Sequence, residues 1–278
     1  MQKKLLISFS GGRTSAYMTW WLFNKWADRG LYEMKVVFAN TGKEVENTLF
    51  FVDECSQEWG IPIVWIEGYP KTVGKGWGVD FKIVDYETAS RNGEPFEAMI
   101  SRIGIPSQSA PFCSPQLKKQ PIKAYAKSIG WKDYYIAIGI RNDEQKRISK
   151  YYIKNKILYP LVHINPVSKN DVKIWWDKQS FDLNIHPDDG NCNACWKKSF
   201  STLARIMNRT PKAFNWWQDM TDKYAYSNQR NNEMKQSFYR EGKSILDIKK
   251  MADMSQAQLR QITMFDKLDG CAQSCEVF

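Results

Sequence analysis

Residues 8–15 read Ser-Phe-Ser-Gly-Gly-Arg-Thr-Ser, a loop rich in glycine and hydroxyl side chains. The apolar run at residues 5–7 before it is typical of a buried parallel strand, and the apolar spacing over residues 16–26 predicts a helix after it. Glycine lets a backbone turn tightly and approach a ligand, and the start of a helix presents free N–H groups to an anion. This Ser-Gly-Gly loop is therefore a candidate anion-binding site.

The candidate binding groups of the loop are hydroxyls, glycines and one fixed charge: Ser8, Ser10, Gly11, Gly12, Arg13, Thr14 and Ser15. The order of these residues matches neither the phosphate-binding loop motif G-x-x-x-x-G-K-[ST] nor the dinucleotide-binding motif G-x-G-x-x-G. The alternative is a glycine turn that joins a strand to a helix and has no binding function. The remainder of the chain favours the binding site.

Strands and helices alternate through the first half of the chain. Apolar runs at residues 34–41, 61–67 and 134–140 predict further strands, and residues 47–59, 94–103 and 115–129 predict helices. Strands that are apolar throughout and separated by helices are typical of a parallel sheet covered on both faces. Residues 71–78, with three glycines and two lysines, are expected to form a mobile loop.

We predict an α/β protein with a Rossmann-like, doubly wound, mostly parallel five-stranded sheet. Residues 1–165 are assigned to a nucleotide-binding α/β domain, and residues 166–278 to a mostly helical region that carries cysteines. Ser168 and Asp171 predict a capped helix that continues over residues 172–178.

Polar residues follow two of the predicted strands, at the edge where ligands bind in open α/β sheets. Asn40, Thr41, Gly42, Lys43 and Glu44, here called the Thr-Gly loop, come directly after one strand. Arg141 and Arg147 follow another, and guanidinium groups there suit a phosphate or sulfate.

Charge and cysteine content narrow the class of protein. The 278 residues carry a formal net charge of +10, which implies an anionic partner such as a nucleotide, a nucleic acid or a membrane surface. No apolar run reaches the length that spans a bilayer, and the N-terminal one is too short for a signal peptide. We therefore expect a cytoplasmic protein without a membrane partner, in which six cysteines are metal ligands, reactive thiols or buried residues rather than disulfides.

Cys192 and Cys195 form a C-x-x-C pair, which aims two thiolates at one point. The candidates for further ligands are Cys113, Cys271 and Cys275, whereas Cys55 lies inside a predicted helix and is expected to be a buried apolar residue. The spacing leaves an iron–sulfur cluster, zinc, a redox-active pair and ordinary thiols as alternatives.

The Ser-Gly-Gly loop resembles the Ser-Gly-Gly-x-Asp-Ser loop of the PP-loop ATP pyrophosphatases and the phosphoadenosine phosphosulfate (PAPS) reductase family, with Thr14 where the family has Asp. The Thr-Gly loop, a Cys-Ser-Pro-Gln-Leu-Lys-Lys segment from Cys113 and the distant C-x-x-C also resemble family motifs, over about residues 4–200. The resemblance implies an adenine nucleotide, with Mg²⁺ if it is ATP, and a [4Fe–4S] cluster on Cys113, Cys192, Cys195 and Cys271, with zinc as the alternative.

The resemblance implies one of two reactions: reduction of a sulfated adenylate, or ATP-dependent sulfur transfer to a tRNA or DNA acceptor with an unidentified electron or sulfur donor. The family's Glu-Cys-Gly-x-His motif is absent from the sequence, so the catalytic roles are assigned to Cys275 as a tail nucleophile and to Arg141.

A third alternative is a protein that binds nucleic acid, has no catalytic activity and contains structural zinc. Residues 141–156 and 197–212 are basic, and Trp196, Trp216 and Trp217 lie near the second stretch.

Overall fold

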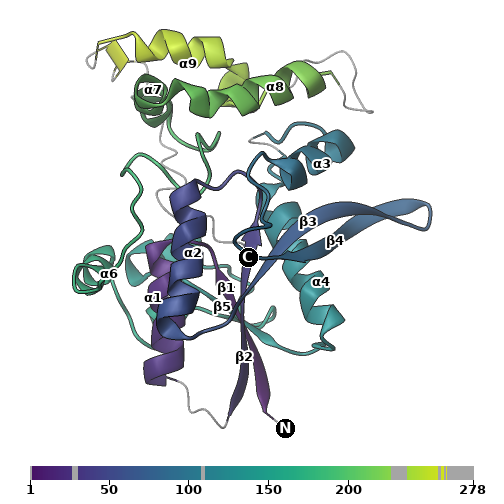
Figure 1. The fold of residues 1–278 in the computed structure, drawn as a ribbon, viewed down its shortest axis with the longest axis vertical. Coiled ribbons are helices and arrows are strands. Elements are labelled where there is room, and N and C mark those ends of the chain that lie inside the picture. Colours follow the sequence, from purple (N-terminus) through teal and green to yellow (C-terminus); the bar gives the residue numbers. More distant parts are fainter. Residues whose placement is uncertain are drawn as a thin grey trace.

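The computed structural model describes residues 2–26, 31–107, 110–226, 237–255, 258–259 and 261. Its centre is a six-stranded sheet in the order β4-β3-β2-β1-β5-β6 (Figure 1). The strands are β1 (Lys3–Phe9), β2 (Tyr32–Asn40), β3 (Ile63–Val73), β4 (Gly76–Val84), β5 (Tyr135–Ile138) and β6 (Ile157–Leu158). All neighbouring strands are parallel except β3 and β4. The predicted α/β class and mostly parallel sheet are confirmed, but the expected number of five strands was wrong.

Helices cover both faces of the sheet. They are α1 (Arg13–Trp21), α2 (Glu46–Trp59), α3 (Glu94–Ile103), α4 (Gln120–Ser128), α5 (Pro160–His163), α6 (Lys169–Trp176), α7 (Phe200–Arg209), α8 (Asn215–Tyr224) and α9 (Ile245–Ala252). Alternate residues of β1 face opposite layers, because side chains of a strand alternate. Leu5 and Ile7 pack with α1, α2 and α6, and Leu6 packs with α4.

A second apolar cluster joins α3 to α7, α8 and α9, beyond the carboxyl ends of the parallel strands (Figure 1). The sheet core also takes in residues from beyond position 165: Val167, Val172 and Trp176 are buried in it. The boundary at residues 165/166 therefore stays a prediction, and residues 167–176 pack with the sheet.

Several predicted boundaries agree with the structure. The helix expected at residues 94–103 is α3 (Glu94–Ile103), and α2 ends at Gly60, whose φ of +60° favours glycine. Ser168 and Asp171 form the expected capping box of α6. The helix expected at residues 115–129 begins as a π-helical turn, Pro115–Lys119, before α4.

The mobile loop expected at residues 71–78 was wrong, because these residues belong to a β-hairpin. β3 and β4 pair from Trp65 and Val84 out to Val73 and Gly76. Glycine disfavours a strand, but strand formation depends more on pairing with a neighbour than on intrinsic preference.

None of the helices in the described part of the chain combines the length and the apolar character that crossing a membrane requires.

Candidate functional site

The Ser-Gly-Gly loop connects the buried strand β1 to α1, and its own hydroxyls hold its shape. Ser15 Oγ accepts a hydrogen bond from the Ser10 N–H at 3.1 Å, lies 2.9 Å from Ser10 Oγ and donates to the Gly12 carbonyl at 2.9 Å. Gly11 has a φ of +81°, and a Cβ there would lie 2.6 Å from Thr48 Cγ2. The loop thus needs glycine at residue 11 and hydroxyls at residues 10 and 15.

Two arginines flank the start of α1, and carboxylates hold both of them in place. Arg13 donates to both carboxylate oxygens of Asp182 at 2.6 and 2.7 Å. Arg141 is buried and donates to Thr14 Oγ1 at 3.1 Å and to Asp143 Oδ1 at 3.0 Å. The structure therefore brings together Arg13, Thr14 and Arg141, as the sequence predicted.

These three residues line a cavity of about 480 Å³ beside the N-terminus of α1. Helix α6 forms the other wall with Lys169, Asn170, Val172, Lys173, Trp176 and Asp177, and Asp182 completes the lining. The sequence analysis missed Lys169 and Lys173. Only the capping box at Ser168 marked this helix in the sequence, and nothing in the sequence showed that α6 packs against α1.

The Thr-Gly loop is fixed by two buried carboxylates. Glu67, at the end of the β3 segment that pairs with β2, accepts from Asn40 Nδ2 and from the Ser90 N–H, both at 2.6 Å. Glu44 accepts from both the N–H and the hydroxyl of Thr41 at 2.8 Å. Each carboxylate is an acceptor that shapes the loop, and Glu67 was not among the predicted site residues.

The CxxC segment, residues 190–195, pairs with the Thr-Gly loop through backbone hydrogen bonds. Glu44 and Cys192 form an antiparallel bridge, and the Asn193 N–H donates to the Lys43 carbonyl at 2.8 Å. Asn191 Nδ2 also donates to the Ser10 carbonyl, and Asn191 Oδ1 is buried with no hydrogen-bond partner among the described residues. The segment therefore joins the two loops that the sequence placed at one edge of the sheet.

Lys43 lies on the cysteine side of this edge. Its ammonium group is 4.8 Å from the centre of the Trp216 ring, a cation–π contact. Burial lowers the pKa of Lys43, and the nearby acidic groups of Cys192 and Glu44 partly oppose that shift. Lys118 lies 3.7 Å from Glu44 Oε1, so two buried lysines surround the Thr-Gly loop.

Three of the predicted metal ligands meet at one cavity. Cys113, Cys192 and Cys195 line a space of about 20 Å³, together with Thr41 and Lys118. That volume has room for about one water molecule. Within the part of the chain that the structure describes, no group of three or more His, Cys, Asp or Glu residues is placed to hold a metal ion.

The remaining cysteines of the chain are Cys55, Cys271 and Cys275. Cys55 is fully buried in α2, and burial raises the pKa of its thiol, as expected for an apolar role. The predicted fourth ligand, Cys271, and the predicted nucleophile, Cys275, lie outside the described residues. Their assignments stay predictions.

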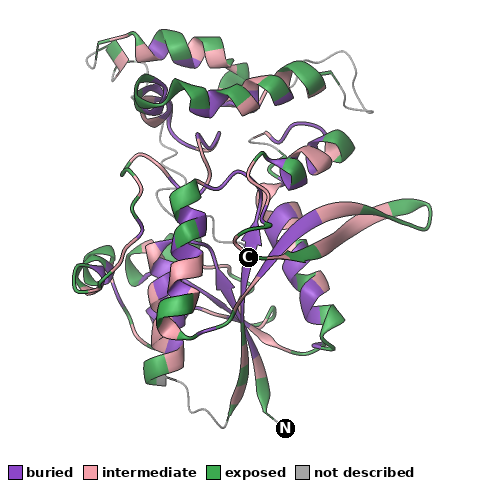
Figure 2. Ribbon diagram, in the orientation of Figure 1, coloured by how far each residue is buried: buried purple, intermediate pink, exposed green. Residues whose placement is uncertain are grey.

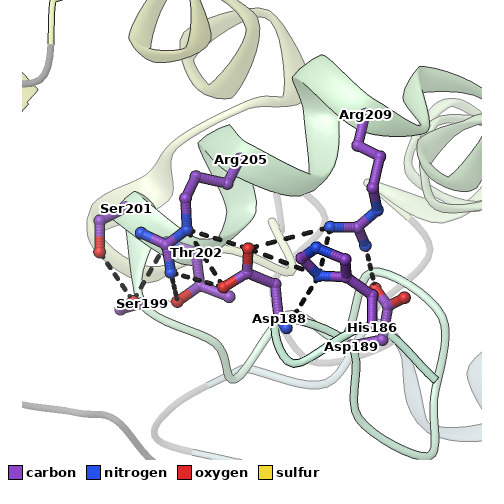
Figure 3. Close-up of polar contacts among 8 residues, drawn as sticks. All are labelled: His186, Asp188, Asp189, Ser199, Ser201, Thr202, Arg205 and Arg209. Carbon is purple, nitrogen blue, oxygen red and sulfur yellow. Dashed lines mark hydrogen bonds and ion pairs between the residues drawn. The ribbon is translucent and has the colours of Figure 1, made fainter.

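In the second basic stretch, Arg205 and Arg209 form ion pairs with aspartates (Figure 3). Arg205 contacts Asp188 at 2.6 Å, and Arg209 contacts Asp189 at 2.5 Å and His186 Nδ1 at 2.8 Å. These contacts attach the segment before the C-x-x-C to α7. Trp217, one of the tryptophans near this stretch, is buried in the core.

In the first basic stretch, Arg147 is paired with Glu144 Oε1 at 2.6 Å, and Glu144 Oε2 lies 3.4 Å from Arg141. Arg147 thus belongs to an ion-pair chain with the buried arginine. This network of ion pairs helps to hold Arg141 in place.

The fold and the loop together define an α/β protein with a helix-N-terminal cavity at the carboxyl edge of a parallel sheet. The chain is 31% identical to an uncharacterized nin region protein, ORF290, of Escherichia phage lambda, over 98% of this chain and 94% of that protein, and it belongs to the same family. No family model matches the chain.

Two further relatives are the uncharacterized proteins MJ0973 and MJ0066 of Methanocaldococcus jannaschii. They are 24% and 25% identical over 84% and 81% of this chain. The chain spans about half the length of these two relatives, 50% and 43%.

Proposed function

We propose that this protein is an enzyme that binds an adenine nucleotide at the Ser-Gly-Gly loop and uses it for sulfur chemistry. The observation that carries the proposal is the 480 Å³ cavity at the start of α1, which Arg13, Arg141, Lys169 and Lys173 line together. The first N–H groups of a helix and converging cations are the usual partners of a phosphate or sulfate group.

Each part of the site has a role in this proposal. The loop backbone and the Thr14 hydroxyl would contact the phosphates or sulfate, and Arg141 would stabilise charge that develops there. Its contacts to Thr14 and Asp143 hold it in place before a ligand arrives. The ligand would therefore present phosphate or sulfate oxygens to these groups. Either ATP, with Mg²⁺, or a sulfated adenylate has this chemistry.

Calorimetric titration of the full chain with ATP plus Mg²⁺, and separately with adenylyl sulfate, tests the proposal. We expect one of the two to bind, and Lys169→Ala to weaken that binding about fivefold, the effect of one lost charge contact to an anion. Lys178→Ala is the matched control, because this lysine is exposed just beyond the same helix. Failure of both nucleotides to bind would overturn the proposal.

The thiols are the second part of the proposal. Cys113, Cys192 and Cys195 would supply three thiolates to an iron–sulfur cluster and Cys271 the fourth, and such a cluster would supply electron transfer or bind sulfur. A C-x-x-C pair that shares a small space with Cys113 also suits zinc, which accepts thiolate ligands. This alternative leads to the second candidate function, a nucleic-acid-binding protein of the same fold with structural zinc.

Metal analysis of an anaerobic preparation separates the two candidates. About four iron and four sulfide per chain, lost in Cys192→Ala and kept in Cys55→Ala, would support the cluster. About one zinc per chain, with the same dependence on Cys192, would support the second candidate. A preparation that contains neither iron nor zinc would contradict the metal site of both candidate functions.

A further inference from the structure

The β3–β4 hairpin continues beyond the edge of the sheet as a two-stranded arm. The last pair between β2 and β3 is Asn40 with Glu67, so residues 68–81, the arm, pair only within the hairpin. Figure 1 shows the arm projecting from the molecule. Because β1, β2 and β3 are parallel, the arm starts at the edge that carries the Ser-Gly-Gly and Thr-Gly loops.

One face of the arm fixes its position. Trp77 and Val79 pack against the cluster that includes α3, and the Phe81 ring lies 5.8 Å from that of Tyr125 on α4. Arg102 of α3 lies 5.8 Å from the centre of the Trp77 ring. The arm is therefore an anchored projection, and these contacts leave the opposite face open.

The opposite face and the tip carry lysines. Tyr69 and Lys71 share this face with Lys82, which comes directly after the arm and lies 4.3 Å from the centre of the Tyr69 ring. Lys71, Lys75 and Lys82 are exposed, and Lys75 lies in the turn between Gly74 and Gly76. The tip of the hairpin is coloured as exposed in Figure 2.

The charge around the arm is unbalanced. Asp80 is the one acidic residue in the sequence of residues 68–84, and it pairs with Lys71 at 2.8 Å. On α4 and the turn before it, Lys123 and Lys119 lie close enough that repulsion adds to burial in lowering the pKa of Lys119. Three lysines against one aspartate give residues 68–84 a net charge of +2, whereas Arg205 and Arg209 are each paired with an aspartate.

We infer that the arm is a docking element for double-stranded DNA. A two-stranded ribbon fits the major groove, which is about 12 Å wide, and the lysines of the open face and tip would contact phosphates. Glycines at the tip let the backbone approach the duplex closely. The inference goes beyond the proposed nucleotide site and does not depend on it.

Edge-strand lysines also have a simpler use, because they keep sheets from pairing with one another. Fluorescence anisotropy with a labelled 20-base-pair duplex, without nucleotide and at several salt concentrations, distinguishes the two uses. We expect Lys75→Ala/Lys82→Ala to lower affinity about tenfold near 0.1 M salt, and to reduce the slope of log affinity against log salt by about 2.

The control variant is Lys249→Ala/Lys250→Ala, which removes the same charge from an exposed part of α9. It should bind the duplex as the unmodified chain does. Equal losses in both variants, tighter binding to the single strand than to the duplex, or no binding to the duplex at all would overturn the inference. Nucleotide titration of the arm variant, expected to be unchanged, keeps this result separate from the proposed function.

Discussion

Asp188 illustrates how single charges hold the C-terminal half in place. Its carboxylate accepts from Arg205 and lies 3.8 Å from Arg209 (Figure 3). The Arg205 hydrogen bonds hold the pKa of Asp188 below its usual range, although burial acts the other way. A carboxyl with a lowered pKa stabilises the fold above its ordinary pKa, and this stabilisation disappears as the pH falls through the lowered value.

We therefore expect Asp188→Asn to reduce the free energy of unfolding by about 1–2 kcal/mol at pH 7. The difference from the unmodified chain should shrink below about pH 4, because the native carboxyl then becomes protonated as well. Urea unfolding at the two pH values measures it. Asp219→Asn, at an exposed position of α8, should change neither value. A deficit of the same size at both pH values would contradict the ion-pair argument.

Helix α6 shows what a short element contributes to the site. Its start is fixed by the Ser168 and Asp171 capping box, and Trp176 Nε1 at its other end donates to the Arg13 carbonyl at 3.0 Å. Lys169 and Lys173 of this helix line the cavity. The position of the cap therefore determines where these two cations lie.

Ser168→Ala should cost about 1 kcal/mol of stability, the usual value for a lost N-cap. If the nucleotide binds in the cavity, its affinity should also fall, because the first turn that carries Lys169 loosens. Ser244→Ala is the matched control, since Ser244 and Asp247 form the same capping box on α9. The two variants should lose similar stability in thermal unfolding, and only the first should lose nucleotide affinity. Equal nucleotide affinities in the two variants would contradict the argument that α6 forms part of the site.

Across the whole molecule, the CxxC segment couples the C-terminal half to the sheet. The Val45 N–H donates to the Asn191 carbonyl at 2.8 Å, and the side chain of Asn191 reaches the Ser10 carbonyl. Asn191 thus contacts the Ser-Gly-Gly loop and the residue that follows the Thr-Gly loop. We therefore expect a change at Asn191 to affect the Ser-Gly-Gly loop.

Asn191→Ala should lower stability by about 1–3 kcal/mol, because the buried Ser10 carbonyl loses its donor. It should also weaken nucleotide binding by about tenfold, the effect of roughly 1.4 kcal/mol at a loop that is no longer held. Asn208→Ala removes an amide-to-carbonyl hydrogen bond to Ala252 on an exposed surface and serves as the control. Calorimetric titration and urea unfolding give the two readouts. Unchanged affinity in Asn191→Ala would contradict the coupling.

Local patterns in the sequence determined the α/β class, the Ser-Gly-Gly loop between strand and helix, and the caps of α2 and α6. Each depends on residues within a few positions of one another: Gly60 ends α2 because it adopts a positive φ, and Ser168 starts α6 because its side chain satisfies a free N–H. Thr14 and Arg141 were also identifiable, because parallel strands end at one edge of a sheet.

Contacts between distant residues were decided only by the tertiary structure. Asp182 pairs with Arg13, Asn191 donates to Ser10, and two lysines of α6, Lys169 and Lys173, line the cavity. Each of these residues lies more than 150 positions along the chain from the loop residue that it approaches. The arm was missed for a similar reason. Its glycines favour a loop locally, and only hydrogen bonding between β3 and β4 makes it a hairpin, because a strand is stabilised by its neighbour and not by its own sequence.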